Sequence, residues 1–324
     1  MEAIQTSYGK AFEYSCLKEL EAEISSYRPV TINTNSSFNV AEAAWNTAPI
    51  NIKNTMKTAA KAGVKTLFQL EPKIFEDGND LLELSLQPDN SGSVGDVRDI
   101  LLIRRSINWE IGLSVKHNHM AAKHSRLSLT IDFGKEWFNI PCSKTYFDNI
   151  RPIFNSLQSA QRNRTRWRDI SNKAETVYMP VLGAFKAELE RLDNENPGII
   201  PSRLLEYLLG RKDFYKLIAN TSNRTTIMQC INFHGTLNKP SSTRAPELRA
   251  GTTNLPTRIY HFDYKDTDSG SSNTTLELVM NQNWVVSFRI HSASSLVESS
   301  LKFDIQIPGA PSTLFHHHQG WQTS

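Results

Sequence analysis

The spacing of apolar residues near the start of the chain predicts a helix. Over residues 7–26 the apolar side chains recur every four positions, which aligns them along one face of an α-helix. Ser7 is a residue type that caps helix N-termini, and Pro29 ends the pattern. The residues on the apolar face are Phe12, Cys16, Leu20 and Ile24. This helix is therefore expected to bury one face against a core.

The next segments have a strand pattern and then a helix pattern. Residues 30–33 alternate apolar and polar side chains, as a short strand does. Residues 40–70 are rich in Ala and Lys and predict two short helices, because Pro49 interrupts the pattern.

An antiparallel hairpin is predicted further along the chain. Residues 99–105 and 109–116 are strand candidates, and residues 106–108 form the turn between them. Residues 127–133 alternate as a further strand. Strands and helices in this order are typical of an α/β core.

The rest of the chain changes character twice. Residues 150–220 are mostly helical in pattern, and residues 237–256 form a connector rich in Pro, Ser, Thr and Gly. Short alternating segments bounded by turn residues then predict strands over 258–264, 276–291 and 301–307. We find no internal repeat. The sequence thus predicts an α/β core, a helical middle region and a β-rich end.

Composition narrows the class of protein. With 39% apolar and 21% charged residues, the chain can bury a core and is not a disordered or collagen-like sequence. No run approaches the ~18 apolar residues of a membrane span, and no basic segment followed by an apolar run marks a secretory leader. The cysteines are odd in number and form no CxxC pair, which argues against disulfides and zinc. We therefore expect a cytoplasmic protein without a membrane partner. The net charge of +3 does not by itself indicate nucleic acid.

The predicted hairpin carries the main candidate for chemistry. A turn centred on Ile107 places Asp99 opposite Val115 and beside Lys116. A carboxylate and an ammonium side by side form the skeleton of a metal-dependent phosphodiesterase. In such a site the carboxylate holds Mg²⁺ at the scissile phosphate, and the lysine orients the attacking water. The alternative is that both residues are solvated strand ends.

A second acid is expected because a hard cation usually needs more than one carboxylate. The position two residues before Lys116 is Ser114, which cannot supply a negative ligand. Glu110 shares its face but lies about 20 Å away along the strand, at ~3.3 Å per residue. Glu13 on the first helix is the better candidate, and Asp96 is a third option.

Basic residues after the hairpin predict DNA contacts. The segment at 116–128 contains no acid, and we expect Lys123, Arg126 and His119 to bind phosphates or guanine edges. Four arginines at i, i+4 spacing over residues 162–168 predict two guanidinium rows on a helix that follows the phosphate backbone. They are Arg162, Arg164, Arg166 and Arg168. Arg289 lies on a predicted strand whose polar face can meet DNA. Solvated surface charge is the alternative in each case.

At this point the sequence resembles type II restriction endonucleases of the HaeIII kind, which cut at GGCC. The matching blocks lie near both ends of the chain and between them. They are GKAFEY (9–14), GDVRDIL (95–101), WEIGLSVKHNHMAAKHSRLS (109–128), IDFGKEW (131–137) and WVVSFRIHSASSLVESSLKFDIQ (284–306). The resemblance implies a PD-(D/E)xK-type mixed β-sheet flanked by helices, with Mg²⁺ at one end of the central hairpin.

The resemblance also implies roles for individual residues and regions. The superfamily's metal-binding aspartate falls on Asp99, its lysine on Lys116 and its helix-one glutamate on Glu13. Asp96 stays a candidate metal ligand from its position three residues before Asp99. Arg98 stands where the proline usually precedes the aspartate, and Ser114 where a second acid is common. The expected regions are a catalytic nuclease core (1–150), a helical DNA-binding region (151–236) and a β-rich region packed on the core (237–324).

The expected partners are double-stranded DNA containing GGCC and a cognate DNA methyltransferase, and the active form is a monomer or a homodimer. Two other functions remain open on the sequence alone. A decayed site with Ser114 in place of the acid would leave a non-catalytic, sequence-specific DNA-binding protein. A repair nuclease of the same superfamily would act on mismatched or branched DNA.

Overall fold

The computed structural model describes residues 2–76, 78–88, 96–118, 123–268 and 270–322. The chain forms two compact units that interleave along the sequence. The first contains Met1–Met120, Gly210–Thr253 and Ser312–Ser324, and the second contains Ala121–Leu209 and Asn254–Pro311. The three consecutive regions expected from the sequence do not coincide with these units. The segment 210–236, expected in the helical region, instead supplies strands to the first unit.

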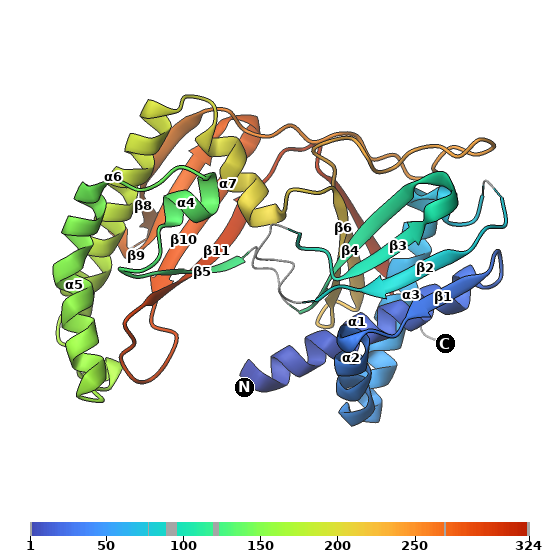
Figure 1. Ribbon diagram of the computed structural model, residues 1–324, viewed down its shortest axis with the longest axis horizontal. Helices are drawn as coiled ribbons and strands as arrows, with labels where there is room; N and C mark the ends of the chain where they lie inside the picture. Colours follow the sequence, from blue (N-terminus) through green and yellow to red (C-terminus); the bar gives the residue numbers. More distant parts are fainter. Residues whose placement is uncertain (1, 77, 89–95, 119–122, 269, 323–324) are drawn as a thin grey trace. The chain divides into compact units, whose positions relative to one another are not determined.

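A mixed β-sheet forms the centre of the first unit (Figure 1). The pairs β1–β2 and β4–β6 are parallel, and the other neighbours are antiparallel. Among the described residues the strands, in sheet order, are β1 (Val30–Asn33), β2 (Leu82–Leu86), β3 (Ile100–Arg104), β4 (Trp109–His117), β6 (Phe214–Asn220), β7 (Thr225–Ile231) and β12 (Phe315–Gly320). The expected α/β fold with a mixed sheet flanked by helices is therefore confirmed.

Helices cover one face of this sheet and bury its core. They are α1 (Glu2–Ile24), α2 (Ser36–Thr47) and α3 (Ile50–Leu70). Phe12 and Leu20 of α1 are fully buried in one apolar cluster with Leu113 and Val115 of β4. The periodicity predicted this face correctly, but the helix begins at Glu2, so Ser7 lies inside it and is not its N-cap.

The second unit has its own antiparallel sheet. Its strands, in sheet order, are β5 (Lys123–Leu127), β11 (Leu301–Gly309), β10 (Val285–His291), β9 (Gly270–Met280) and β8 (Ile259–Thr267). Its helices are α4 (Phe133–Phe138), α5 (Lys144–Arg162), α6 (Met179–Glu195) and α7 (Ile200–Leu209). Aromatic rings fill the space between them: the centroid of Phe185 lies 5.0 Å from Phe303 and 5.4 Å from Phe288.

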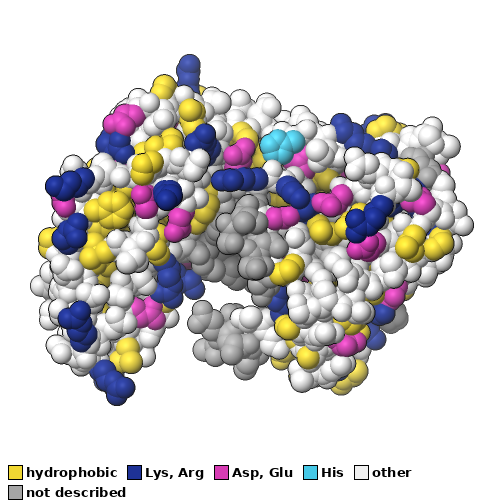
Figure 2. Space-filling model, in the orientation of Figure 1, with side chains coloured by type: hydrophobic (Ala, Val, Ile, Leu, Met, Phe, Trp, Pro, Cys, Tyr) yellow, Lys and Arg dark blue, Asp and Glu magenta, His cyan; other side chains and the backbone are white. Residues whose placement is uncertain are grey.

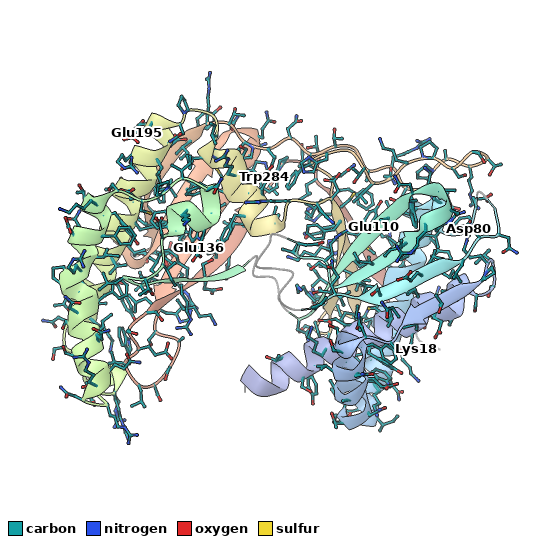
Figure 3. All side chains as sticks on the ribbon, in the orientation of Figure 1. Lys18, Asp80, Glu110, Glu136, Glu195 and Trp284 are labelled. Carbon is teal, nitrogen blue, oxygen red and sulfur yellow. The ribbon has the colours of Figure 1, made fainter. Side chains whose placement is uncertain are left out.

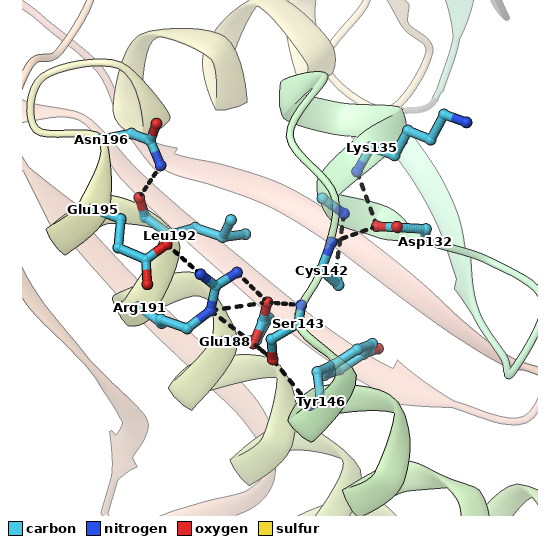
Figure 4. A network of polar contacts seen from close by, with 11 residues as sticks. Asp132, Lys135, Cys142, Ser143, Tyr146, Glu188, Arg191, Leu192, Glu195 and Asn196 are labelled. Atoms are coloured by element: carbon cyan, nitrogen blue, oxygen red, sulfur yellow. Dashed lines mark hydrogen bonds and ion pairs between the residues drawn. The ribbon is translucent and has the colours of Figure 1, made fainter.

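Polar caps explain why residues 127–133 are not the strand expected from their alternation. The Asp132 carboxylate accepts hydrogen bonds from the backbone N–H groups of Lys135 (2.9 Å) and Cys142 (3.0 Å), which starts helix α4 (Figure 4). Ser143 caps α5 and is held by Glu188, whose carboxylate accepts from its N–H at 2.6 Å and its hydroxyl at 2.7 Å. Side-chain capping thus overrides the alternating pattern.

Candidate active site

Asp99 and Lys116 meet at one end of the central hairpin. Asp99 immediately precedes β3, and Lys116 is the next-to-last residue of β4. The Lys116 Nζ donates to Asp99 Oδ2 at 3.0 Å, and the Val115 N–H donates to the same oxygen at 2.6 Å. The Ser114 hydroxyl lies 3.3 Å from it. Among the described residues none donates to the other carboxylate oxygen, Oδ1, so that oxygen is available to a ligand.

The register of the hairpin differs from the expected one by one residue. Ile100 pairs with Leu113, so Ser114 rather than Val115 stands across from Asp99. The reason is the turn: Arg105–Ile107 forms a short 3₁₀ segment, and Asn108 follows in the left-handed region with φ 49°. The turn therefore contains one more residue than a turn centred on Ile107. Lys116 still reaches Asp99 because its side chain is long.

Glu13 of α1 is the acid that the sequence suggested as the second metal ligand. It is only 7% exposed, and Lys10 Nζ donates to its Oε2 at 3.1 Å. Burial raises the pKa of Glu13 to about 7, the negative charge of Asp99 adds to this rise, and Lys10 and Lys116 oppose it. The helix therefore brings Glu13 into the electrostatic field of both hairpin residues.

Asp96 belongs to a different cluster. Its carboxylate accepts from Arg98 Nε at 2.8 Å and from the guanidinium nitrogen Nη2 at 2.7 Å. Arg98 also donates to Glu110, at the start of β4 (Figure 3), at 2.8 Å. Asp96 and Glu110 therefore form ion pairs with Arg98 and belong to a different cluster from Asp99 and Lys116. The expected exclusion of Glu110 fits this arrangement, and Asp96 is placed with Arg98 as a structural ion pair.

Gly112 leaves space for the Arg98 side chain, which pairs with both Asp96 and Glu110. A Cβ atom at Gly112 would lie 2.1 Å from Arg98 Cδ, so any larger residue would displace the arginine. The arginine that replaces the usual proline before the aspartate therefore has a packing partner on the next strand.

Lys216 is a residue that the sequence analysis missed. It lies on β6 directly across from Ser114 in the parallel β4–β6 pair, so both side chains share one face with Lys116. It is 8% exposed. Burial lowers the pKa of Lys216 to about 8, the Lys116 charge adds to this effect, and Asp99 opposes it. A charged residue inside the apolar run Phe214–Asn220 is the sequence feature that marks it.

The donor set suits a hard cation with few protein ligands. Within the described ranges, no three His, Cys, Asp or Glu side chains gather as a metal site. Two carboxylates, Asp99 and Glu13, remain as candidates. Mg²⁺ is typically held by one or two carboxylates together with water and phosphate oxygens. The residues present therefore fit Mg²⁺ and do not fit an all-protein cage.

The two expected guanine readers, Lys123 and Arg126, lie in β5. Arg126 donates to the Glu298 carboxylate and to the Ser300 hydroxyl, both at 2.7 Å, while its side chain remains 43% exposed. His119 and the side chain of Lys123 fall outside the described part of the chain. Arg289 of β10 is exposed and pairs with Asp304 of β11 at 3.3 Å. Arg126 and Arg289 are thus both held by acids at the surface of the second unit's sheet.

The prediction that residues 162–168 form two guanidinium rows on a helix is wrong. Helix α5 ends at Arg162, Arg164 is in the left-handed region with φ 53°, and Trp167 is buried. The backbone turns because Arg166 forms a bridge to Leu296. All four arginines are nevertheless exposed, so they form a basic turn and not a helical face. Figure 2 shows Lys and Arg side chains at the surface around this end of α5, at the lower left.

A family model described as HaeIII restriction endonuclease matches residues 9–311. The chain belongs to this family. A curated relative, "Type II restriction enzyme HaeIII" of Haemophilus aegyptius, is 44% identical over 314 residues, which cover 97% of each chain. No solved structure matches.

Family membership confirms the resemblance drawn from the sequence blocks. It also confirms the expected enzyme class, a type II site-specific deoxyribonuclease. The match includes α1, the central hairpin and the second unit's sheet, and so contains Glu13, Asp99 and Lys116. Across the described residues, no helix is both long and apolar enough to span a membrane.

Proposed function

We propose that the chain makes Mg²⁺-dependent double-strand cuts in DNA at a short palindrome, GGCC. The observation that carries this proposal is the ion pair between Asp99 and Lys116 at the hairpin end, with Glu13 beside it. The identity of 44% to an enzyme named HaeIII supports the same class of cleavage. The site GGCC rests on the resemblance of the family blocks.

The chain's own residues then have the following roles. Asp99 and Glu13 would hold the metal ion, which would supply positive charge at the scissile phosphate and favour ionisation of water. Lys116 orients the attacking water and stabilises the negative charge of the pentacovalent phosphorus. The attacking water releases a proton to solvent as its oxygen bonds to phosphorus, the bond to the leaving oxygen breaks, and the leaving oxygen takes a proton from solvent.

Glu13 would gain its negative charge on binding a cation. Its pKa of about 7 without a cation means that part of the population is protonated near neutral pH. A bound cation stabilises the carboxylate, so binding releases a proton.

Recognition of bases is assigned to Arg126 and Lys123 of the second unit, which read guanine O6 and N7 in the major groove. His119 is a further DNA contact. The exposed arginines at 162–168, together with Arg289, bind phosphates and supply affinity that does not depend on sequence. A cognate methyltransferase protects host DNA at the same site. A palindromic target is compatible with a homodimer or with a monomer that cuts each strand in turn.

Digestion of a sequenced plasmid tests this function. The purified protein is incubated with Mg²⁺ or with EDTA, and the ends of all fragments are sequenced. We expect Mg²⁺-dependent cuts at GGCC alone. Cuts at another fixed sequence would overturn the GGCC assignment, and cuts only at mismatched or branched DNA would favour a repair nuclease. An intact plasmid that is still shifted in a gel would favour a DNA-binding protein without activity.

A further inference from the structure

A buried lysine that has no hydrogen-bond or ion-pair partner among the described residues lies on the strand next to the proposed catalytic pair. Lys216 is 8% exposed and lies across from Ser114 on the neighbouring parallel strand. Among the described residues, none forms a hydrogen bond or an ion pair with its ammonium group. Within the described ranges, one lysine donates a hydrogen bond to Asp99, and that lysine is Lys116, at 3.0 Å.

Such a group is unfavourable for the folded chain unless it has a function. A buried ammonium loses its hydration, and without an anion or an acceptor nothing replaces that hydration. Natural sheets rarely bury a lysine in this way, and such groups concentrate at functional sites. The position on the same face as Lys116 and Ser114 puts this charge next to the reacting centre.

The residue across from Lys216 is Ser114. In the superfamily pattern this strand position usually carries an acid, which would add negative charge and help to bind cations. Here the position is a small hydroxyl residue that lies 3.3 Å from Asp99, and the neighbouring strand contributes a fixed positive charge instead. A phosphate oxygen that arrives at Asp99 and Lys116 therefore meets a second ammonium group.

We propose that Lys216 binds a non-bridging oxygen of the scissile phosphate and supplies positive charge in the transition state, across from the strand position, Ser114, where the superfamily usually carries an acid. This inference rests on the proposed function. The lowered pKa of Lys216, about 8, agrees with it, since the group keeps mostly its charged form near neutral pH and gains charge when an anion arrives.

A double-mutant cycle between the lysine and the phosphate tests the contact directly. The DNA affinity of the wild type and of Lys216→Met is measured in Ca²⁺, with a GGCC duplex that carries either a normal phosphate or an uncharged methylphosphonate at the scissile position. We expect the methylphosphonate to weaken wild-type binding about tenfold more than it weakens binding of Lys216→Met. Lys216→Arg keeps the charge and should retain most of that difference.

Two controls make the cycle specific. A methylphosphonate placed outside the recognition site should show no coupling to residue 216. Lys239→Met removes a charge from an exposed position of the connector and should couple to neither phosphate. Lys216→Met should unfold at the same or a higher temperature than the wild type, because it removes a buried charge. If it does not fold, Lys216→Gln replaces it in the cycle.

Single-turnover cleavage in Mg²⁺ separates this inference from the proposed function. We expect wild-type cleavage at GGCC and a rate about 100-fold lower for Lys216→Met. Coupling below about twofold overturns the contact, whatever the rates are. A wild type that does not cleave overturns the proposed function, while the binding cycle still decides whether Lys216 meets the phosphate.

Discussion

The ammonium of Lys116 lies 3.0 Å from the Asp99 carboxylate, although 17 positions separate the two residues in the sequence. The hairpin between β3 and β4 brings them together, and its register is set by the 3₁₀ turn at Arg105–Ile107. Lys116 lies in β4, and the backbone of Asp99 is held by hydrogen bonds with Leu113 and Gln87. Charges held in this way need little reorganisation when a phosphate arrives, which favours catalysis.

Restoring an acid at position 114 should reduce cleavage. In Ser114→Glu the new carboxylate would lie across from Lys216 and form an ion pair with it, so the lysine would be unavailable to the phosphate. We expect a single-turnover rate at least ~10-fold lower than that of the wild type.

Ser114→Ala is the matched control, since it removes the hydroxyl without adding charge. It should stay within about threefold of the wild-type rate, as one weak hydrogen bond at 3.3 Å is lost. Faster cleavage by Ser114→Glu would mean that the serine marks a weakened site and that Lys216 does not replace the acid.

Glu13 should make the metal-free protein less stable as the pH rises. The folded state keeps this proton up to a pKa of about 7, while the unfolded chain releases it near the ordinary glutamate pKa of 4.5. The folded state therefore binds more protons between these values, and stability falls as the pH rises from about 4.5 to 7. Urea unfolding in EDTA over this range measures the effect.

Glu13→Gln is expected to remove that part of the pH dependence, a difference on the order of 1–3 kcal/mol at pH 8. Glu71, whose pKa is also raised to about 7 by burial, contributes equally to both proteins and cancels in the comparison. Parallel stability curves for Glu13→Gln and the wild type would show that Glu13 is already ionised in the fold, and would contradict this assignment.

The sequence predicted the parts of the fold that have strong local patterns. The apolar face of α1, the break at Pro49 and the hairpin with Asp99 and Lys116 follow from periodicity and turn residues. These features depend on neighbours in the chain, so a pattern is enough to find them. The register error at the hairpin arose from the length of one turn, which periodicity does not specify.

Features that depend on distant segments could not be predicted. The strand Phe315–Gly320 has a run of histidines and no strand pattern, and it forms because β7 offers it an edge. The basic turn after Arg162 departs from a helix because Arg166 bridges to Leu296, far along the chain. Lys216 is a site candidate because it lies across from Ser114 of β4, and a single sequence does not show that these two strands are neighbours.

Arg126 should act in recognition of bases and not only of phosphates. Loss of one bidentate guanine contact in Arg126→Ala is expected to weaken binding to a GGCC duplex by about 1–3 kcal/mol, with little change for random DNA. Arg289→Ala, which also breaks an ion pair with an acid, is the comparison and should affect both duplexes equally. Equal losses on both duplexes for Arg126→Ala would make it a phosphate contact.

The exposed arginines at 162–168 should control the salt dependence of binding. Replacing all four by alanine is expected to reduce the slope of log affinity against log salt by about one for each arginine, on cognate and random DNA alike. Replacing Lys144 and Arg151, which are exposed on α5 and paired with Asp148, gives a control with the same type of charge loss. An unchanged slope would show that DNA does not reach the basic turn.

The role of Asp99 is tested most directly by single-turnover cleavage of a GGCC duplex by Asp99→Asn in saturating Mg²⁺, with DNA affinity measured in parallel in Ca²⁺. The amide keeps the shape of the side chain and removes the charge that holds the metal. We predict a cleavage rate at least ~100-fold below that of the wild type, in a protein that is folded and still binds the duplex. Cleavage within about threefold of the wild-type rate would contradict the assignment of the active site to the pair of Asp99 and Lys116.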